Sequence, residues 1–142
     1  CESVAARMRE YDFICETIQI GIRDNELNSY ERQGKLEIPC CCAKTFFDKA
    51  FDLYQKNHIS GKPIRSLSVR ACNLSVQEHE QLSFLPELVK IQKLEQAEKA
   101  VESIRRRFGH FAIQRGLMLT DKKLSSLNPK EEHIIYPANF FN

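Results

Sequence analysis

The sequence predicts an α+β fold in which two helices pack on one face of a largely antiparallel sheet, followed by a long C-terminal helix and an irregular tail. Two kinds of apolar spacing support this prediction. Apolar residues alternate with polar ones in residues 15–24 and 64–74, which is typical of half-buried strands. They recur every three or four residues in 2–11, 41–57 and 87–109, which is typical of helices that bury one side.

The first helix and the first strand each have a distinct apolar side. In the helix, the expected stripe consists of Val4, Ala5, Met8 and Tyr11. In the strand, every second residue is expected to point inward, namely Ile18, Ile20 and Ile22. The alternate positions are polar or glycine, namely Thr17, Gln19, Gly21 and Arg23. This strand should therefore have one buried face and one face in water.

A second, more polar strand is predicted between a turn at residues 24–28 and Pro39. Proline lacks the N–H donor that a ladder needs, so Pro39 suits the end of a strand. The strand contains Arg32, Gln33 and Lys35, but its weak alternation does not assign these three residues to a face.

The second helix and the third strand complete the predicted sheet domain. The helix is expected to bury one side, formed by Phe47, Ala50, Phe51 and Tyr54. The inward residues of the third strand are expected to be Leu67, Val69 and Ala71. Its outward residues are expected to be Ser66, Ser68, Arg70 and Cys72.

Bulk composition gives no argument for a nucleic-acid or membrane protein. The net charge is only +2, and 42% hydrophobic with 28% charged residues is an ordinary globular composition. No apolar run approaches the roughly 20 residues that span a bilayer, and no leading segment has the pattern of a secretory signal. The sequence starts at Cys1 rather than at methionine, which suggests a fragment of a longer protein.

The six cysteines lack the paired spacing of a zinc site, so no metal site is predicted. They are expected to be reduced, as is usual for cytosolic thiols. Cys40, Cys41 and Cys42 lie where the second helix should begin, a position that would allow a somewhat acidified thiol. No function is assigned to them.

The outward residues of the first and third strands form a surface without carboxylates. Arg23 and Arg70 would supply charge to phosphates, and Ser66 and Ser68 would supply neutral donors. Gly21 would let a backbone approach closely. Such a surface would hold a nucleic-acid backbone by shape and charge, without reading sequence strongly. The alternative is that exposed strands simply carry polar residues.

Several stretches of the chain occur in a characteristic order: ESVAARMR, YERQGKL ahead of EIP, KTFFDKAFDLYQK and, above all, GKPIRSLSVRACNL. Through them, residues 2–74 resemble the little finger domain of Y-family DNA polymerases, the translesion enzymes of the DinB/UmuC (ImpB/MucB/SamB) group. The tail AVESIRRRFGHFAIQRGLML, with HIIYPANFF, is similar to the segment that follows this domain in Gram-positive UmuC-like members.

The resemblance implies a DNA-binding domain that grips duplex primer–template DNA beside a polymerase active site, in the bacterial cytoplasm at the nucleoid and away from membranes. By position, it implies backbone contacts from Arg23, Arg32, Gln33, Lys35, Ser68 and Arg70. Two further candidates are Arg65 and Ser66.

One departure from the family concerns the start of the domain. The family's little finger has four strands, and the first of them precedes the first helix, whereas this chain starts inside that helix. Either that strand is cut off, or residues 131–141 or a neighbouring molecule take its place. A bare sheet edge invites pairing between chains, so a dimer through this edge is one alternative.

A short apolar run interrupts the polar connector after the third strand: Gln81-Leu82-Ser83-Phe84-Leu85. Bacterial members of the resembled family carry a peptide for the ring-shaped sliding clamp, usually Gln, Leu, Ser or Asp, then Leu-Phe. The first three places match, and the last two residues are swapped. Gln81 would hydrogen-bond at a pocket mouth, and the apolar side chains would fill a cleft. The alternative is that these apolar residues cap the protein's own core.

No catalytic residue and no cofactor site is predicted in this piece. Phosphoryl transfer by polymerases needs carboxylates that hold two metal ions, whereas acids such as Asp24 and Glu26 lie in turns. The resemblance implies that the parent is a DNA-directed DNA polymerase, a nucleotidyltransferase that uses Mg²⁺. The predicted organisation is a little finger domain at 1–75, a linker with the clamp peptide at 76–87, and a helix with a tail at 88–142.

A rival interpretation is a protein-interaction module that dimerises through the long C-terminal helix and does not bind DNA. Its apolar stripe consists of Leu94, Ala97, Val101, Ile104 and Phe108. Salt dependence separates the two interpretations, because phosphate binding weakens as salt rises, whereas apolar helix pairing barely responds.

Overall fold

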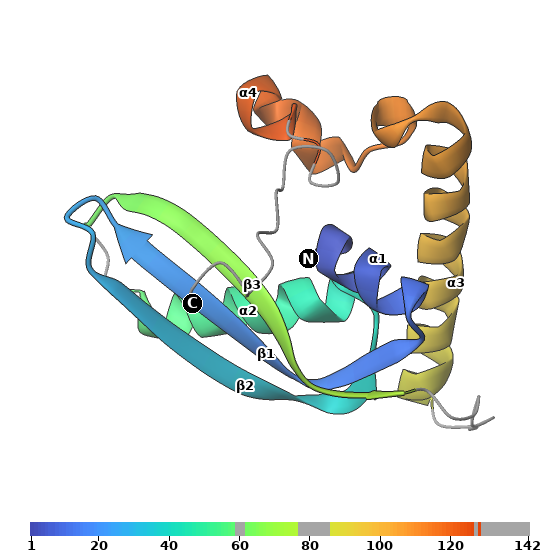
Figure 1. Cartoon of the computed structure of the whole chain (residues 1–142), viewed down its shortest axis with the longest axis horizontal. Coiled ribbons are helices and arrows are strands. Elements are labelled where there is room, and N and C mark those ends of the chain that lie inside the picture. Colours follow the sequence, from blue (N-terminus) through green and yellow to red (C-terminus); the bar gives the residue numbers. More distant parts are fainter. Residues whose placement is uncertain (59–61, 77–85, 127, 129–142) are drawn as a thin grey trace, which may run out of the picture. The chain divides into compact units, whose positions relative to one another are not determined.

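The computed structural model of the chain describes residues 1–58, 62–76, 86–126 and 128. In chain order, its main elements are α1 (Glu2–Glu10), β1 (Phe13–Asp24), β2 (Ser29–Cys40), α2 (Ala43–Asn57), β3 (Ile64–Val76) and α3 (Pro86–Phe108) (Figure 1). They are followed by the 3-10 helices η1 (His110–Ala112) and η2 (Gly116–Thr120) and by helix α4 (Lys122–Ser125). The chain divides into two compact units, Cys1–Lys99 and Ala100–Asn142.

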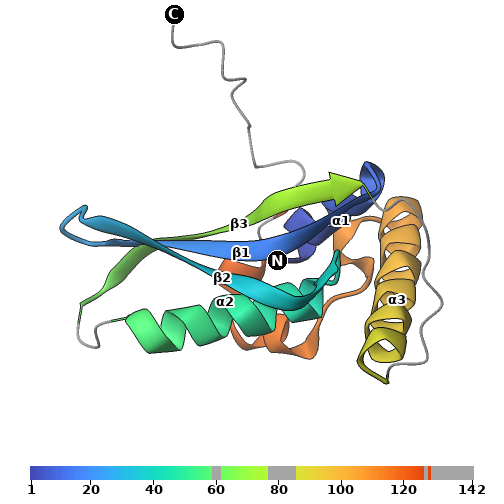
Figure 2. The same ribbon diagram turned by 90° about the horizontal axis from the view of Figure 1, so that it is seen from below.

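The three strands form one antiparallel sheet in the order β2-β1-β3, which confirms the predicted α+β fold. Helix α2 lies along one side of the strands, as Figure 2 shows, and both α1 and α2 contact β1. Among the described residues, the outer edge of β3 has no partner strand. None of the described helices combines the length and the apolar character needed to cross a membrane.

The core of the first unit lies between the sheet and helices α1 and α2. The inward residues of β1 are buried as predicted, namely Ile18, Ile20 and Ile22. Ala5 and Met8 of α1 are also buried, whereas Tyr11 follows the end of the helix and is 70% exposed. The predicted stripe is therefore right within the helix and wrong at its end.

Two of the four residues predicted on the buried side of α2 are exposed instead. Phe46 is completely buried and Ala50 is 8% exposed, but Phe47 and Phe51 are 45% and 46% exposed. Phe47, Phe51 and Tyr54 form a row of stacked rings along the helix. Two adjacent phenylalanines fit the same helical period, so spacing alone does not decide which of them faces the sheet.

The edge strand β3 buries less than predicted. Val69 and Ala71 are partly buried against the core. Leu67 pairs with buried Ile22 and so lies on the helix side of the sheet, yet it is 61% exposed. Inward orientation therefore does not ensure burial at the edge of this sheet.

The strand alternation changes near Asn73, which has a φ of 54° towards the end of β3. The β1–β2 register shifts close by, between Cys15 and Thr17. Asn73 Nδ2 donates a hydrogen bond to Thr17 Oγ1 at 3.1 Å, and Thr17 is only 5% exposed. Thr17 was expected to be outward and solvated, but this amide contributes to covering it.

Candidate nucleic-acid interface

Strand pairing orders the side chains on the sheet face that points away from α2. Residues directly opposite each other on neighbouring strands point to the same side. Pairing along β1 therefore builds four rows across β2, β1 and β3: Lys35–Thr17–Cys72, Gln33–Gln19–Arg70, Glu31–Gly21–Ser68 and Ser29–Arg23–Ser66. We call this surface the open face.

Most of the open face is exposed to solvent. The exposed residues are Arg23, Ser29, Glu31, Gln33, Lys35, Ser66, Ser68 and Arg70. Gln19 and Cys72 are half-buried, and the Cys72 thiol donates to Gln19 Oε1 at 3.5 Å. Five of the six residues predicted to contact DNA lie together here, namely Arg23, Gln33, Lys35, Ser68 and Arg70.

Arg32, the sixth predicted residue, lies on the other face of the sheet. It pairs with buried Ile20, and its Nε donates to Asn57 Oδ1 of α2 at 3.2 Å. Its guanidinium carbon lies 5.3 Å from the centre of the Tyr30 ring. Strand β2 is polar on both faces, so its sequence does not show which way Arg32 points. The prediction that Arg32 shares a face with the other five residues is therefore wrong.

Of the two further candidates for DNA contact, Ser66 and Arg65, the strand pairing places only Ser66 on the open face. Ser66 pairs with Arg23 and lies on the open face. Arg65 falls at a register shift, where Arg23 pairs with Ser66 but Asp24 pairs with Ile64. The strand pairing therefore does not assign Arg65 to the open face.

Glu31 is an acidic residue on the open face that the sequence pattern did not identify. Gln19 Nε2 donates a hydrogen bond to Glu31 Oε2. In the same row, a Cβ on Gly21 would lie 2.5 Å from Ser68 Oγ, so the serine hydroxyl occupies the space that glycine leaves. Only the strand register, which brings Glu31 opposite Gly21, reveals this carboxylate.

The charges on the open face are spread along the strands. Lys35, Arg70 and Arg23 lie in three different rows, and Glu31 lies in the row between those of Arg70 and Arg23. Rows on one face are two residues apart, so the four rows extend over roughly 20 Å. Such a surface can meet several phosphates of one backbone, with neutral donors between the cations.

The three consecutive cysteines at the start of α2 are buried. Cys40, Cys41 and Cys42 are 2%, 3% and 0% exposed. Burial raises the pKa of Cys40 to about 11 and that of Cys41 to about 12, and the Glu95 carboxylate adds to the shift at Cys41. The acidified thiol that this position would allow is therefore not found at Cys40 or Cys41, because desolvation of a thiolate outweighs the attraction of a helix N-terminus.

Alkaline pH is expected to destabilise this core. Burial raises the pKa of Cys15 from 9.0 to about 12, as it does for Cys41. The neutral thiols therefore stabilise the fold fully below about pH 9, and this contribution is lost as pH rises towards about 12. We expect the free energy of unfolding, measured with urea, to fall less between about pH 8 and about pH 10 in Cys15→Val than in the wild type. Equal falls would contradict the prediction.

The candidate clamp peptide, Gln81–Leu85, lies outside the described residues, so clamp binding stays a prediction. The apolar stripe of α3 is partly used within the chain, since Leu94 packs against the core of the first unit. In the second unit, Ile104 and Phe108 are 38% and 64% exposed.

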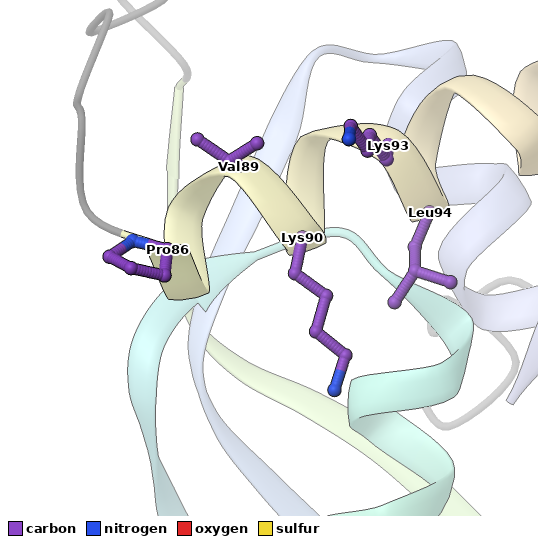
Figure 3. Close-up of a pocket in the computed structure, with 5 residues that line it drawn as sticks. All are labelled: Pro86, Val89, Lys90, Lys93 and Leu94. Carbon is purple, nitrogen blue, oxygen red and sulfur yellow. The ribbon is translucent and has the colours of Figure 1, made fainter.

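A shallow hollow of about 330 Å³ lies along the first turns of α3 (Figure 3). It is lined by Pro86, Val89, Lys90, Lys93 and Leu94. Lys90 and Leu94 project from the same side of the helix, whereas Val89 points the other way. This lining offers lysine as its only charged side chain, and it suggests no chemistry.

Comparison with known proteins identifies relatives of the chain. Residues 1–84 match the model of the impB/mucB/samB family C-terminal domain. The chain is 34% identical over 127 residues to the DNA polymerase IV of Acetivibrio thermocellus, a match that covers 89% of this chain and 32% of that protein. It is 28% identical over 123 residues to the DNA polymerase IV of Clostridium acetobutylicum, covering 84% of this chain and 30% of that protein. The chain thus spans about a third of the length of these relatives.

Proposed function

The chain belongs to the impB/mucB/samB family, as its C-terminal domain, and from this premise we propose that its open face holds the backbone of primer–template DNA for a translesion DNA polymerase. The relatives named DNA polymerase IV support DNA as the partner. The observation that carries the proposal is the strand pairing, which gathers the exposed cations Arg23, Lys35 and Arg70 on one surface.

Each group on the open face has a role in this grip. The three cations would neutralise phosphates and release the counterions condensed on DNA, which drives binding to any sequence. The Gln33 amide and the Ser68 hydroxyl would donate to phosphate or sugar oxygens without reading the bases. A surface that ignores sequence suits an enzyme that must follow damaged templates.

We further propose that this piece supplies binding rather than chemistry. In the parent enzyme, carboxylates outside this chain would hold the Mg²⁺ ions of phosphoryl transfer. Within the described ranges, no group of three or more His, Cys, Asp or Glu side chains is placed to hold a metal ion.

Fluorescence anisotropy with labelled duplex primer–template DNA tests the proposed binding of the DNA backbone. The logarithm of the binding constant should fall as the logarithm of the salt concentration rises, with a slope of roughly 0.9 for each neutralised phosphate. Binding that stays constant between about 50 and 200 mM salt would contradict the proposal.

Glu31→Gln is expected to strengthen DNA binding about three- to tenfold at low salt, because it removes a negative charge close to the phosphates. Glutamine keeps an oxygen that can accept the hydrogen bond from Gln19. Anisotropy titrations measure the change, which should shrink as salt screens the charges. The control is Asp52→Asn on α2, which removes an equal charge beyond the other face. Equal gains in both variants would show that Glu31 has no special place in the interface.

We also propose that Gln81–Leu85 docks on the bacterial sliding clamp, on the support of its sequence pattern and the family membership. Replacing Leu82 and Phe84 with alanine should abolish binding to a purified clamp, since each buried anchor of this kind costs roughly 2 kcal/mol on removal. Surface plasmon resonance measures the binding, and a thermal melt checks the fold. A melted fold would instead place these residues in the protein's own core.

A second candidate function is dimerisation, through α3 or through the edge of β3. The exposure of Ile104 and Phe108 favours it, whereas the packing of Leu94 in the chain's own core opposes it. Sedimentation equilibrium decides between the candidates. A dimer that persists at about 1 M salt, in a protein that does not bind DNA, would support this second function.

A further inference from the structure

Helix α2 begins without a capping side chain of its own. Its N-cap residue, Cys42, makes no side-chain cap hydrogen bond, and its first turn contains no acidic residue. The first N–H groups of a helix need acceptors from elsewhere, usually a local side chain or water. Here the acceptors come from helix α3, whose Glu98 follows Ala43 by 55 residues.

Two carboxylates of α3 accept these backbone N–H groups. Glu98 Oε2 accepts from Ala43 N at 3.0 Å, and Glu98 Oε1 accepts from Lys44 N at 3.3 Å. Glu95 Oε1 accepts from Cys41 N at 3.0 Å and from the Cys41 thiol at 3.3 Å. A negative charge at this place also meets the positive end of the α2 dipole.

Arg9 of α1 joins the same contact. Its Nη1 donates to Glu98 Oε2 at 2.7 Å and to the Cys41 carbonyl oxygen at 2.6 Å. The Arg9 and Glu98 side chains are only 7% and 12% exposed, so salt screens this ion pair weakly. Three helices therefore meet at one largely buried carboxylate.

We propose that Glu95, Glu98 and Arg9 form a latch that makes the first half of α3 part of the DNA-binding unit. The family match ends at residue 84, yet the compact unit continues to Lys99. The connector that leaves β3 after Val76 returns to the same unit at Pro86. Resting on the proposed function, this means that both ends of the connector that carries the candidate clamp peptide are anchored on the DNA-binding unit, rather than only one of them.

Amide hydrogen exchange in the full chain tests the latch. Glu98→Gln should speed exchange at Ala43 and Lys44 by at least about tenfold, because a glutamine side chain lacks the charge and offers one oxygen instead of two. The control is Glu87→Gln, which removes the same charge from an exposed position in the first turn of α3 and should change neither rate. Unchanged rates in Glu98→Gln would overturn the latch.

A milder variant keeps the test decisive if Glu98→Gln does not fold. Glu95→Gln alters the acceptor of one backbone N–H only, so faster exchange should be confined to Cys41. An exchange rate at Cys41 equal to that of the wild type would count against the latch as directly as the first variant does.

Binding of a purified sliding clamp to the same variants tests whether the latch constrains the connector that would bind the clamp. Affinity should fall about three- to tenfold in Glu98→Gln, because a constrained segment loses less freedom on binding than a loose one. It should not change in Asp52→Asn, which removes the same charge from helix α2. Faster amide exchange with unaltered clamp affinity would show that the latch does not affect how the connector binds the clamp. A wild-type chain that does not bind the clamp would refute the proposed tether and this role together, while the exchange rates would still decide the latch.

Discussion

Replacing Arg23, Lys35 and Arg70 together with alanine is expected to lower the affinity for duplex primer–template DNA roughly 100-fold at low salt. The three side chains are exposed and lie in different rows of the open face. Their loss removes the phosphate neutralisation that drives binding to any sequence. An anisotropy titration at about 50 mM salt measures the effect.

A matched variant on the other side of the sheet controls for net charge. Lys44, Lys49 and Lys56 all belong to α2, and their replacement by alanine removes the same number of positive charges. This variant should bind DNA within about twofold of the wild type, because its changes lie away from the open face. Equal losses in the two triple variants would mean that net charge governs binding, not the open face.

Glu98→Ala is expected to lower the free energy of unfolding by about 3 kcal/mol. The substitution breaks the largely buried ion pair with Arg9 and removes the acceptor of two backbone N–H groups at the start of α2. Urea unfolding of the full chain, followed by circular dichroism, gives the free energy of each variant.

The comparison variant for this measurement is Glu87→Ala, which changes an exposed glutamate of the same helix. Its free energy of unfolding should stay within about 0.5 kcal/mol of the wild type. A loss below about 1 kcal/mol in Glu98→Ala would show that the contact with α2 is incidental, since exposed ion pairs contribute no more than that.

The sequence predicts the sheet domain because burial on one side imposes a period on the chain. Ile18, Ile20 and Ile22 lie on the central strand under two helices, so their alternation matches their burial. The same argument weakens at the edge, where Leu67 points inward but is exposed. It also predicted burial of Phe47 where Phe46 is the buried residue, since adjacent residues of one type fit the same helical period.

The candidate site could be predicted only in part. Arg23, Ser68 and Arg70 follow clear alternation, and the structure places them on one face. Strand β2 is polar on both sides, so neither the orientation of Arg32 nor the place of Glu31 could be predicted without the register. The latch of Glu95 and Glu98 has no local signal at all, because it joins segments more than 50 residues apart through tertiary packing.

The most direct test of DNA binding through the open face compares two arginines on opposite faces of the sheet. Both Arg70 and Arg32 are exposed, but Arg70 pairs with Gln19 on the open face and Arg32 pairs with buried Ile20 on the other. The measurement is the log–log slope of DNA affinity against salt for Arg70→Ala, Arg32→Ala and the wild type. We expect the slope to shrink by roughly 0.9 in Arg70→Ala and to stay unchanged in Arg32→Ala. Equal changes in both variants, or a change in Arg32→Ala alone, would contradict binding through the open face.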